Sequence, residues 1–505
     1  MDNTIRLRFA PSPTGALHIG GIRTALYNFL LARKYGGTFI LRIEDTDQVR
    51  YVPGAEEYII EALQWAGLTP DEGPGFGGEY GPYRQSERKD IYAQYAVQLV
   101  ESGHAYYAFD TPEELEAARK NNDSFKYDGA TRLRMRNTLS LPASDAEALL
   151  NSDTPRVIRL KVPAGEIIHI QDLIRGDVSF QSDELDDKVI MKADGMPTYH
   201  LANIVDDHLM KITHVIRGEE WLPSTAHHVL LYRAFGWEST IPQFAHLPLI
   251  LKPSGNGKLS KRDGVQLGIP VFPLSWKGET EAESFTGFRE AGFLPAAMIN
   301  FLALLGWNPG TEQEIFSVEE LCQAFAVEKI GKAGARFDID KARWFNKEYI
   351  KALDNSVLAT VVRPIIEAHG HQPENTYLEA FCGLMKERVT LLPEFWANGY
   401  YFFEEIKHFD AAEITKRWKP ESGPMLEALT DVLRDTADFS AEGLHHTLQQ
   451  FIQERGLKNG EVLPLLRLAL AGSMSGPGVP DVMSLIGRDW ALKRLTFAAQ
   501  GFGIM

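Results

Sequence analysis

Residues 8–21, RFAPSPTGALHIGG, constrain the fold of this chain more than any other stretch. The run Ile5–Phe9 indicates a short buried strand, and the two prolines that follow forbid a helix and force a tight loop. From Leu17 onward the apolar residues recur at helical spacing until Gly36. The stretch therefore predicts a strand, a loop and the start of a long helix, where unpaired backbone N–H groups favour phosphate.

Four residues of this loop suit an anion site. Gly15, Gly20 and Gly21 allow a ligand to approach the backbone closely, and His18 falls in the first turn of the predicted helix. An ordinary strand-to-helix turn with a surface histidine is the alternative interpretation, and a second stretch of the sequence decides between the two.

That second stretch is GKLSKR at residues 257–262, in a loop rich in glycine and serine. Together the two stretches resemble the two signatures of the class I aminoacyl-tRNA synthetases. The first signature runs His, apolar, Gly, His, and here Gly21 stands in its last place. The second runs Lys, apolar, Ser, Lys, small residue, and here Arg262 stands in its last place. The leading Ala-Pro-Ser-Pro-Thr-Gly resembles the glutamyl-tRNA synthetase branch, and the resemblance covers nearly the whole chain.

Strands and helices alternate along the first hundred residues. A second strand is predicted at residues 38–43, and helices are predicted at 53–65 and 86–101. This alternation is typical of a parallel sheet flanked by helices. We expect the same pattern to resume at the strand 188–191 and to end with a strand near residues 247–251.

Between these two halves the sequence changes character. Thr111 to Glu114 has the capping-box pattern of a helix start, and strands are predicted at 157–162, 166–171 and 177–181. From about Ala335 the chain is helical almost throughout. The expected fold class is α/β: a Rossmann-like parallel sheet split by an α+β insertion domain, followed by an all-helical C-terminal region.

The resemblance implies a role for each part. We expect the two halves of the catalytic domain at 1–103 and 188–251, an insertion domain for the tRNA acceptor end at 104–187, a lysine-loop and tRNA stem-contact domain at 252–335, and an anticodon-binding region at 336–505.

Composition narrows the possible partners and compartments. The net charge of −16 argues by itself against a nucleic-acid partner, but local clusters of basic residues decide such binding. No apolar run approaches the roughly 20 residues of a membrane span, and no basic segment followed by an apolar run marks a secretory signal. We therefore expect a cytoplasmic protein without a membrane partner. We also expect it to act as a monomer. The basic clusters are Arg132, Arg134 and Arg136, and Arg336, Lys341 and Arg343.

Two cysteines, Cys322 and Cys382, lack partners at metal-ligand spacing. Some members of the family that the chain resembles carry a Cys-rich zinc site, where this chain has AYYAF at residues 105–109. We therefore predict neither zinc nor any other bound metal, and expect Mg2+ only in the substrate complex with ATP.

The family joins an amino acid carboxylate to the α-phosphate of ATP and then transfers the aminoacyl group to the terminal ribose of tRNA. Negative charge concentrates on the transferring phosphate, so positioned donors matter more than a nucleophile. The resemblance implies that His18, Lys258 and Lys261 are catalytic. The ATP site is expected to comprise Gly15, His18, Gly20, Gly21, Glu220, Lys258, Leu259, Ser260, Lys261 and Arg262.

A glutamate substrate carries two carboxylates and one ammonium, so its site needs two cations and an anion. Arg8 and Arg217 end predicted parallel strands, and arginine suits planar carboxylate binding. Glu44 ends a strand at the same edge and is the candidate for the ammonium. An alternative for Arg217 is a helix-capping or ion-paired arginine beside Glu219 and Glu220. The expected glutamate site is Arg8, Ala10, Ser12, Glu44, Tyr199, Asn203 and Arg217.

The anticodon of tRNA(Glu) would be read in the helical region by Arg343, Trp344 and Arg388, because unpaired bases stack on aromatic or arginine side chains. A solvated helix surface is the alternative interpretation of these residues.

Other functions fit the sequence less well. A glutaminyl-tRNA synthetase would share the chemistry, and a catalytically inactive tRNA-binding paralogue would share the fold. The run Asp45 to Val49 matches a phosphatase motif of the pattern Asp-x-Asp-x-Val, but this leaves both signatures unexplained. A P-loop fails because Leu259 replaces the Ser or Thr that follows the lysine.

Overall fold

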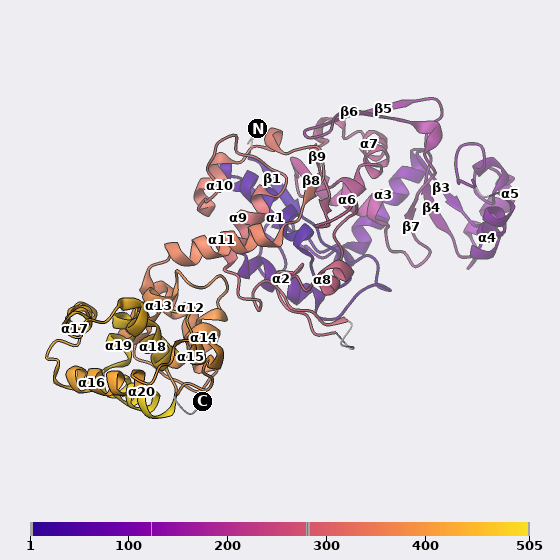
Figure 1. Ribbon diagram of the computed structural model, residues 1–505. Helices are drawn as coiled ribbons and strands as arrows, with labels where there is room; N and C mark the ends of the chain where they lie inside the picture. The colour runs from indigo at the N-terminus through magenta and orange to yellow at the C-terminus, as the bar shows by residue number, and fades with distance from the viewer. Residues whose placement is uncertain (1–3, 123, 279, 281–282, 503–505) are drawn as a thin grey trace. The chain divides into compact units, whose positions relative to one another are not determined.

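The computed structural model describes residues 4–122, 124–278, 280 and 283–502. The chain forms two compact units, one made of residues 1–290 and 295–339 and the other of residues 291–294 and 340–505 (Figure 1).

A largely parallel sheet organises the first unit. Its strands are β1 (Arg6–Phe9), β2 (Thr38–Leu41), β5 (Ile167–Asp172), β6 (Gly176–Gln181), β8 (His214–Gly218) and β9 (Gln243–Leu247). The strand order is β2-β1-β8-β9-β5-β6, and every neighbouring pair is parallel except β5 and β6.

Helix α1 (Ile19–Lys34) packs against β1, β2 and β8. Its side chains are mostly buried between Ile22 and Ala32, as the apolar spacing predicts for a helix covered on several sides. Further helices of the unit are α2 (Ala55–Trp65), α3 (Lys89–Glu101), α6 (Tyr199–Leu209), α7 (Ser224–Ala234), α8 (Lys261–Leu267), α9 (Pro295–Leu304) and α10 (Val318–Ala324).

A smaller antiparallel sheet lies at one end of the unit, next to helices α4 (Pro112–Asn121) and α5 (Ala143–Leu150) (Figure 1). It has the order β3-β4-β7, formed by β3 (Ala105–Ala108), β4 (Val157–Leu160) and β7 (Val189–Met191). Thr111 caps α4 through the predicted capping box with Glu114.

Three expectations about the strands are wrong. The strand predicted to resume the parallel pattern at 188–191 is β7, which instead pairs antiparallel with β4. The strands predicted inside the insertion at 166–171 and 177–181 are β5 and β6, and β5 joins the main sheet through β9. The strand predicted near 247–251 is divided between β9 and β10 (Ile250–Leu251), and β10 pairs with β11 (Ala335–Arg336). Strand pairing depends on tertiary contacts, which local periodicity does not encode.

The second unit is helical in its described part, as the sequence predicts. Buried apolar side chains such as Leu426, Leu466 and Leu495 lie on one face of their helices and form its interior. The helices are α11 (Ile339–Ala352), α12 (Asn355–Glu367), α13 (Asn375–Met385), α14 (Glu394–Gly399), α15 (Ala411–Arg417), α16 (Ser422–Asp435), α17 (Ala441–Glu454), α18 (Asn459–Ala471), α19 (Val479–Ile486) and α20 (Arg488–Gly501). Across the residues that the structure describes, no helix combines the length and apolarity needed to cross a membrane.

Candidate functional site

A cavity of about 500 Å3 lies at the carboxyl edge of the parallel sheet. Loops that follow β1, β2, β8 and β9 contribute to its lining, as expected where parallel strands end. The predicted site residues that line this cavity are Arg8, Ala10, Ser12, His18, Gly20, Gly21, Glu44, Tyr199, Asn203, Arg217, Glu220, Lys258 and Leu259.

His18 lies at the N-cap of α1, and its Nδ1 accepts a hydrogen bond from the backbone N–H of Gly20 at 3.1 Å. The neutral ring therefore carries its proton on Nε2, which is buried and has no hydrogen-bond partner among the described residues. Burial, and then the positive charge of Lys258, lowers the pKa of His18 from 6.5 to about 4. At neutral pH the cavity thus has an N–H donor beside a helix N-terminus.

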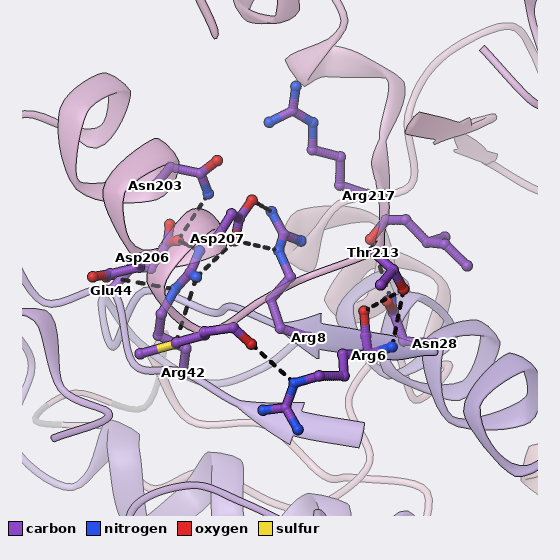
Figure 2. A network of polar contacts seen from close by, with 12 residues as sticks. Arg6, Arg8, Asn28, Arg42, Glu44, Asn203, Asp206, Asp207, Thr213 and Arg217 are labelled. Carbon is purple, nitrogen blue, oxygen red and sulfur yellow. Dashed lines mark hydrogen bonds and ion pairs between the residues drawn. The ribbon is translucent and has the colours of Figure 1, made fainter. Parts of the chain in front are cut away.

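Two of the buried arginines, Arg8 and Arg42, are held by carboxylates (Figure 2). Arg8 Nε donates to Asp207 Oδ1 at 3.0 Å, and its Nη2 donates to Asp207 Oδ2 at 3.3 Å. Arg42 donates to the same Asp207 at 2.7 Å and to Glu44 at 3.0 Å, and Asn203 donates to Glu44 at 3.2 Å. Arg8 and Glu44 therefore line the cavity, and each is already paired with an oppositely charged residue, Arg8 with Asp207 and Glu44 with Arg42.

Arg217 is different, because within the described structure each hydrogen bond of its guanidinium goes to a neutral group. Its Nη1 donates to the Tyr199 hydroxyl at 2.6 Å, and its Nη2 donates to the Thr225 hydroxyl at 2.8 Å. The side chain is buried, and burial lowers the pKa of Arg217. Figure 2 shows its guanidinium apart from the network around Asp207.

The ion-pair half of the alternative for Arg217 is wrong, whereas its Nη2 does donate to the backbone carbonyl of Trp221, in the turn that follows β8, at 3.3 Å. Glu219 pairs with Arg175 at 2.5 Å, and Glu220 pairs with Lys258 at 2.7 Å. A buried cation without a carboxylate partner is costly, so the cavity favours an anionic ligand at Arg217.

The lysine stretch lies partly in the cavity. Lys258 and Leu259 line it, whereas Ser260, Lys261 and Arg262 do not, within the described part of the chain. Ser260 forms a capping box with Asp263 and so starts α8 at Lys261. Lys261 Nζ donates to the Glu283 carbonyl at 2.9 Å and lies 4.9 Å from the centre of the Phe285 ring.

Gly15 also lies outside the cavity lining in the described structure. Its φ of 136° is a backbone conformation that suits glycine, so this residue shapes the loop rather than the wall of the cavity.

The predicted anticodon residues lie in the helical unit. Arg343 pairs with Asp340 at 3.3 Å on α11, and the neighbouring Trp344 ring lies 4.0 Å from Lys341 Nζ. Arg388 follows α13 and donates to the Leu384 carbonyl at 2.8 Å.

Sequence reasoning missed several residues of the site. Asp207 and Arg42 hold Arg8 and Glu44, and Trp221 lines the cavity with its ring 4.5 Å from that of Tyr199. The sequence signal that could have identified Arg42 and Asp207 is a charged residue within an apolar segment. Arg42 immediately follows β2, and Asp207 lies on the buried face of α6. The described residues contain no group of three or more His, Cys, Asp or Glu side chains able to hold a metal ion.

Comparisons with known proteins agree with this architecture. Residues 4–344 match the family described as tRNA synthetases class I (E and Q), catalytic domain, and residues 357–499 match the anticodon binding domain. The chain is 53% identical over 504 residues to a glutamate–tRNA ligase of Porphyromonas gingivalis, covering 100% of both chains. It is 51% identical over 500 residues to that of Phocaeicola vulgatus, covering 99% of each.

A crystal structure of a glutamate tRNA ligase from Elizabethkingia meningosepticum, in complex with its amino acid, is similar with a TM-score of 0.95. The two sequences are 48% identical, and the match covers 99% of this chain and 100% of that one. The chain therefore belongs to the glutamate–tRNA ligase family, within the class I tRNA synthetases of the E and Q group.

Proposed function

We propose that this chain activates L-glutamate with ATP to form glutamyl-adenylate and transfers the glutamyl group to the terminal ribose of tRNA(Glu). The single observation that carries the choice of amino acid is Arg217, a buried cation in the cavity whose hydrogen-bond partners among the described residues are all neutral. A substrate with a side-chain carboxylate supplies the missing negative charge.

The glutamate subsite surrounds Arg217. Tyr199 and Asn203 form its helical side, and Ala10 and Ser12 contribute from the loop after β1. Arg8 binds a substrate carboxylate, and Glu44 binds the ammonium. Burial raises the pKa of Glu44, and an arriving ammonium favours its ionised form.

The ATP subsite lies at the N-terminus of α1. The Nε2–H of His18 donates to a phosphate oxygen, and Gly20 and Gly21 allow the phosphates to approach the backbone. Lys258 supplies positive charge, Leu259 packs against the nucleotide, and Glu220 binds its ribose or adenine. ATP enters as its Mg2+ complex.

The remaining predicted ATP contacts require movement of the lysine stretch. Ser260, Lys261 and Arg262 reach the phosphates only when the N-terminus of α8 turns toward the cavity, because Lys261 points to Glu283 and Phe285 in the structure. Gly15 allows the opening loop to follow this movement.

The other parts of the chain bind tRNA. Residues 104–187 contact the acceptor end, residues 252–335 the stem, and residues 336–505 the anticodon, with Arg343, Trp344 and Arg388 as base contacts. We infer that the enzyme acts as a monomer in the cytoplasm, where a reducing environment suits the free thiols of Cys322 and Cys382.

Aminoacylation with purified tRNA(Glu) and tRNA(Gln) tests this proposal. Each tRNA is charged in the presence of ATP with glutamate, glutamine or aspartate, and the esterified amino acid is identified. We expect glutamate on tRNA(Glu). Glutamine as the preferred amino acid would make the chain a glutaminyl enzyme, and charging of neither tRNA would make it an inactive tRNA-binding paralogue.

A further inference from the structure

Three buried polar side chains form a row across neighbouring strands at the edge of the sheet where the cavity lies. Asp172 ends β5, His246 lies on β9, and Arg217 lies on β8. Arg217 and His246 are register partners in the parallel pair β8–β9, and β5 is the next strand along. Asp172 is 2% exposed and His246 is 0% exposed. Neither residue lines the cavity within the described structure, so neither touches a substrate there.

The two carboxylate oxygens of Asp172 have different hydrogen-bond partners. Oδ1 accepts hydrogen bonds from the backbone N–H groups of Ile174 at 2.9 Å, Arg175 at 2.8 Å and His246 at 3.3 Å. Oδ2 lies 2.6 Å from His246 Nδ1. These contacts hold the pKa of Asp172 below its usual value although burial opposes ionisation. An ionised carboxylate cannot donate, so the proton between Oδ2 and Nδ1 belongs to the histidine.

The other nitrogen of His246 is then an acceptor. Arg217 Nε lies 3.0 Å from His246 Nε2, and a guanidinium nitrogen always donates. Burial lowers the pKa of His246, which keeps the ring neutral and Nε2 free of a proton. Only one arrangement of protons therefore satisfies both hydrogen bonds of this row. Asp172 is an ionised carboxylate, His246 is neutral with its proton on Nδ1, and Arg217 is a protonated guanidinium.

This arrangement fixes the edge of Arg217 formed by Nε and Nη2, because the Thr225 hydroxyl that accepts from Nη2 lies 3.3 Å from His246 Nε2. The remaining nitrogen, Nη1, is thereby turned toward the Tyr199 hydroxyl. We propose that Asp172 and His246 are positioning residues that orient Arg217 for the side-chain carboxylate of the substrate and so determine amino acid specificity. The proposal rests on the role of Arg217 given above. Asp172 acts through the tautomer of His246, and His246 acts through its bond to Arg217.

The variant Asp172→Asn tests the row with little change in size. The three backbone N–H donors require an oxygen at the Oδ1 position, so the amide NH2 of the new side chain faces His246 Nδ1. That nitrogen must then accept, the ring proton moves to Nε2, and two donors face each other at Arg217. The readout is the ratio of kcat/KM for glutamate to kcat/KM for glutamine, because loss of folded enzyme lowers both values equally.

We expect Asp172→Asn to lower this ratio by about tenfold or more, as mutation of partners that orient a metal-binding histidine commonly does. His246→Phe, which removes the acceptor, should lower it similarly, whereas His246→Gln retains an oxygen acceptor and should lower it less. The matched control is His227→Gln, a buried histidine of α7 that hydrogen-bonds to Asp186 and not to Arg217. Its ratio should remain that of the wild type.

A double-mutant cycle with Arg217→Gln separates this proposal from the function on which it depends. If Asp172 acts through Arg217, adding Asp172→Asn to Arg217→Gln changes the ratio little further. An unchanged ratio in Asp172→Asn, or the same loss with and without Arg217, would overturn the positioning role while wild-type charging of tRNA(Glu) still stood. Failure of the wild-type enzyme to charge glutamate would instead overturn the function itself.

Discussion

At the scale of single residues, the charge of the groups that contact each buried arginine determines how strongly that arginine can bind a ligand carboxylate. Arg8 and Arg42 share the carboxylate of Asp207, while Arg217 has hydroxyl, imidazole and carbonyl partners. Neutral acceptors satisfy the N–H groups without compensating the charge, so a carboxylate ligand gains more at Arg217 than at Arg8.

Arg217→Gln should therefore lose much more kcat/KM for glutamate than for glutamine. A site built on polar pairing can discriminate a matched from a mismatched group by roughly 10⁴-fold, so a loss of about a thousandfold for glutamate is expected. Steady-state charging of tRNA(Glu) with each amino acid measures both values. Equal losses for the two amino acids would assign Arg217 to the α-carboxylate or to a structural role.

Arg8→Gln is the matched comparison for that experiment. Asp207 keeps its bond to Arg42 at 2.7 Å in this variant, so the network survives in part. Since Arg8 already binds Asp207 through Nε and Nη2, we expect it to contact the α-carboxylate that both amino acids share. Glutamate and glutamine should then lose kcat/KM by similar factors.

At the scale of secondary-structure elements, the starts of two helices present the signature residues differently. His18 is an N-cap whose bond to Gly20 fixes its tautomer and leaves Nε2–H available at the cavity. Lys261 is the first residue of α8, and its ammonium group donates a hydrogen bond to the Glu283 carbonyl outside the cavity. In the proposed ATP site, the start of α1 could therefore bind a phosphate without rearrangement, whereas the start of α8 would have to move first.

Lys261→Ala should lower the rate of glutamate activation by roughly a hundredfold or more, the usual effect of removing one preorganised donor to a transition state. Activation is measured by ATP–pyrophosphate exchange in the presence of tRNA(Glu). Lys277→Ala changes an exposed lysine of the nearby segment and serves as the control, with an expected rate near that of the wild type. A wild-type rate in Lys261→Ala itself would remove this lysine from catalysis.

At the scale of the whole molecule, the cavity belongs entirely to the first unit. Its lining residues fall between Arg8 and Leu259, and the pair β10–β11 closes the unit near Arg336. We therefore expect amino acid activation and reading of the anticodon to be separable along the chain.

A chain ending at Asp338 should fold with its cavity intact but select tRNA poorly. Loss of partners for residues 291–294, such as the Asn346 side chain that binds the Leu294 N–H at 2.7 Å, should lower its stability somewhat. Urea unfolding tests the folding, and charging of tRNA(Glu) with altered anticodons tests the selection. If anticodon dependence is unchanged in the shortened chain, the helical unit does not read the anticodon.

The stability of the whole protein should depend on pH through its buried histidines. Burial lowers their pKa values, to about 4 for His18 and about 3 for His200. The unfolded chain therefore binds more protons than the folded one below pH 6.5, and the free energy of unfolding falls as the pH drops from 6.5 toward 4. Above about pH 7.5 these histidines are unprotonated in both states and no longer contribute to the pH dependence. The other histidines lowered in this way are His208, His214, His227, His228 and His246.

Urea unfolding of the full chain between pH 7.5 and 5 measures this effect, with pH values chosen to span the ordinary histidine pKa of about 6.5. His200→Gln should reduce the slope of stability against pH, whereas His104→Gln, at an exposed position, should leave it unchanged. A free energy of unfolding that is constant across this range would contradict the prediction.

Local signals in the sequence determined much of this architecture. The prolines and glycines between β1 and α1, the capping box at Thr111 and the helical periodicity of the C-terminal region all act within a few residues, so each element could be predicted near its observed place. The fold class is confirmed for the same reason, because alternation of strand and helix is itself a local pattern.

Tertiary structure alone decided which segments pair. β5 joins the main sheet while β7 leaves it, Asp207 neutralises Arg8 from 199 residues away, and Lys261 turns toward Glu283. The sequence predicted Arg8 and Arg217 as equivalent cations, and only the distant carboxylate makes them different. Ion pairs and strand neighbours depend on distances in space, and such distances between remote residues are set by the packed core rather than by local sequence.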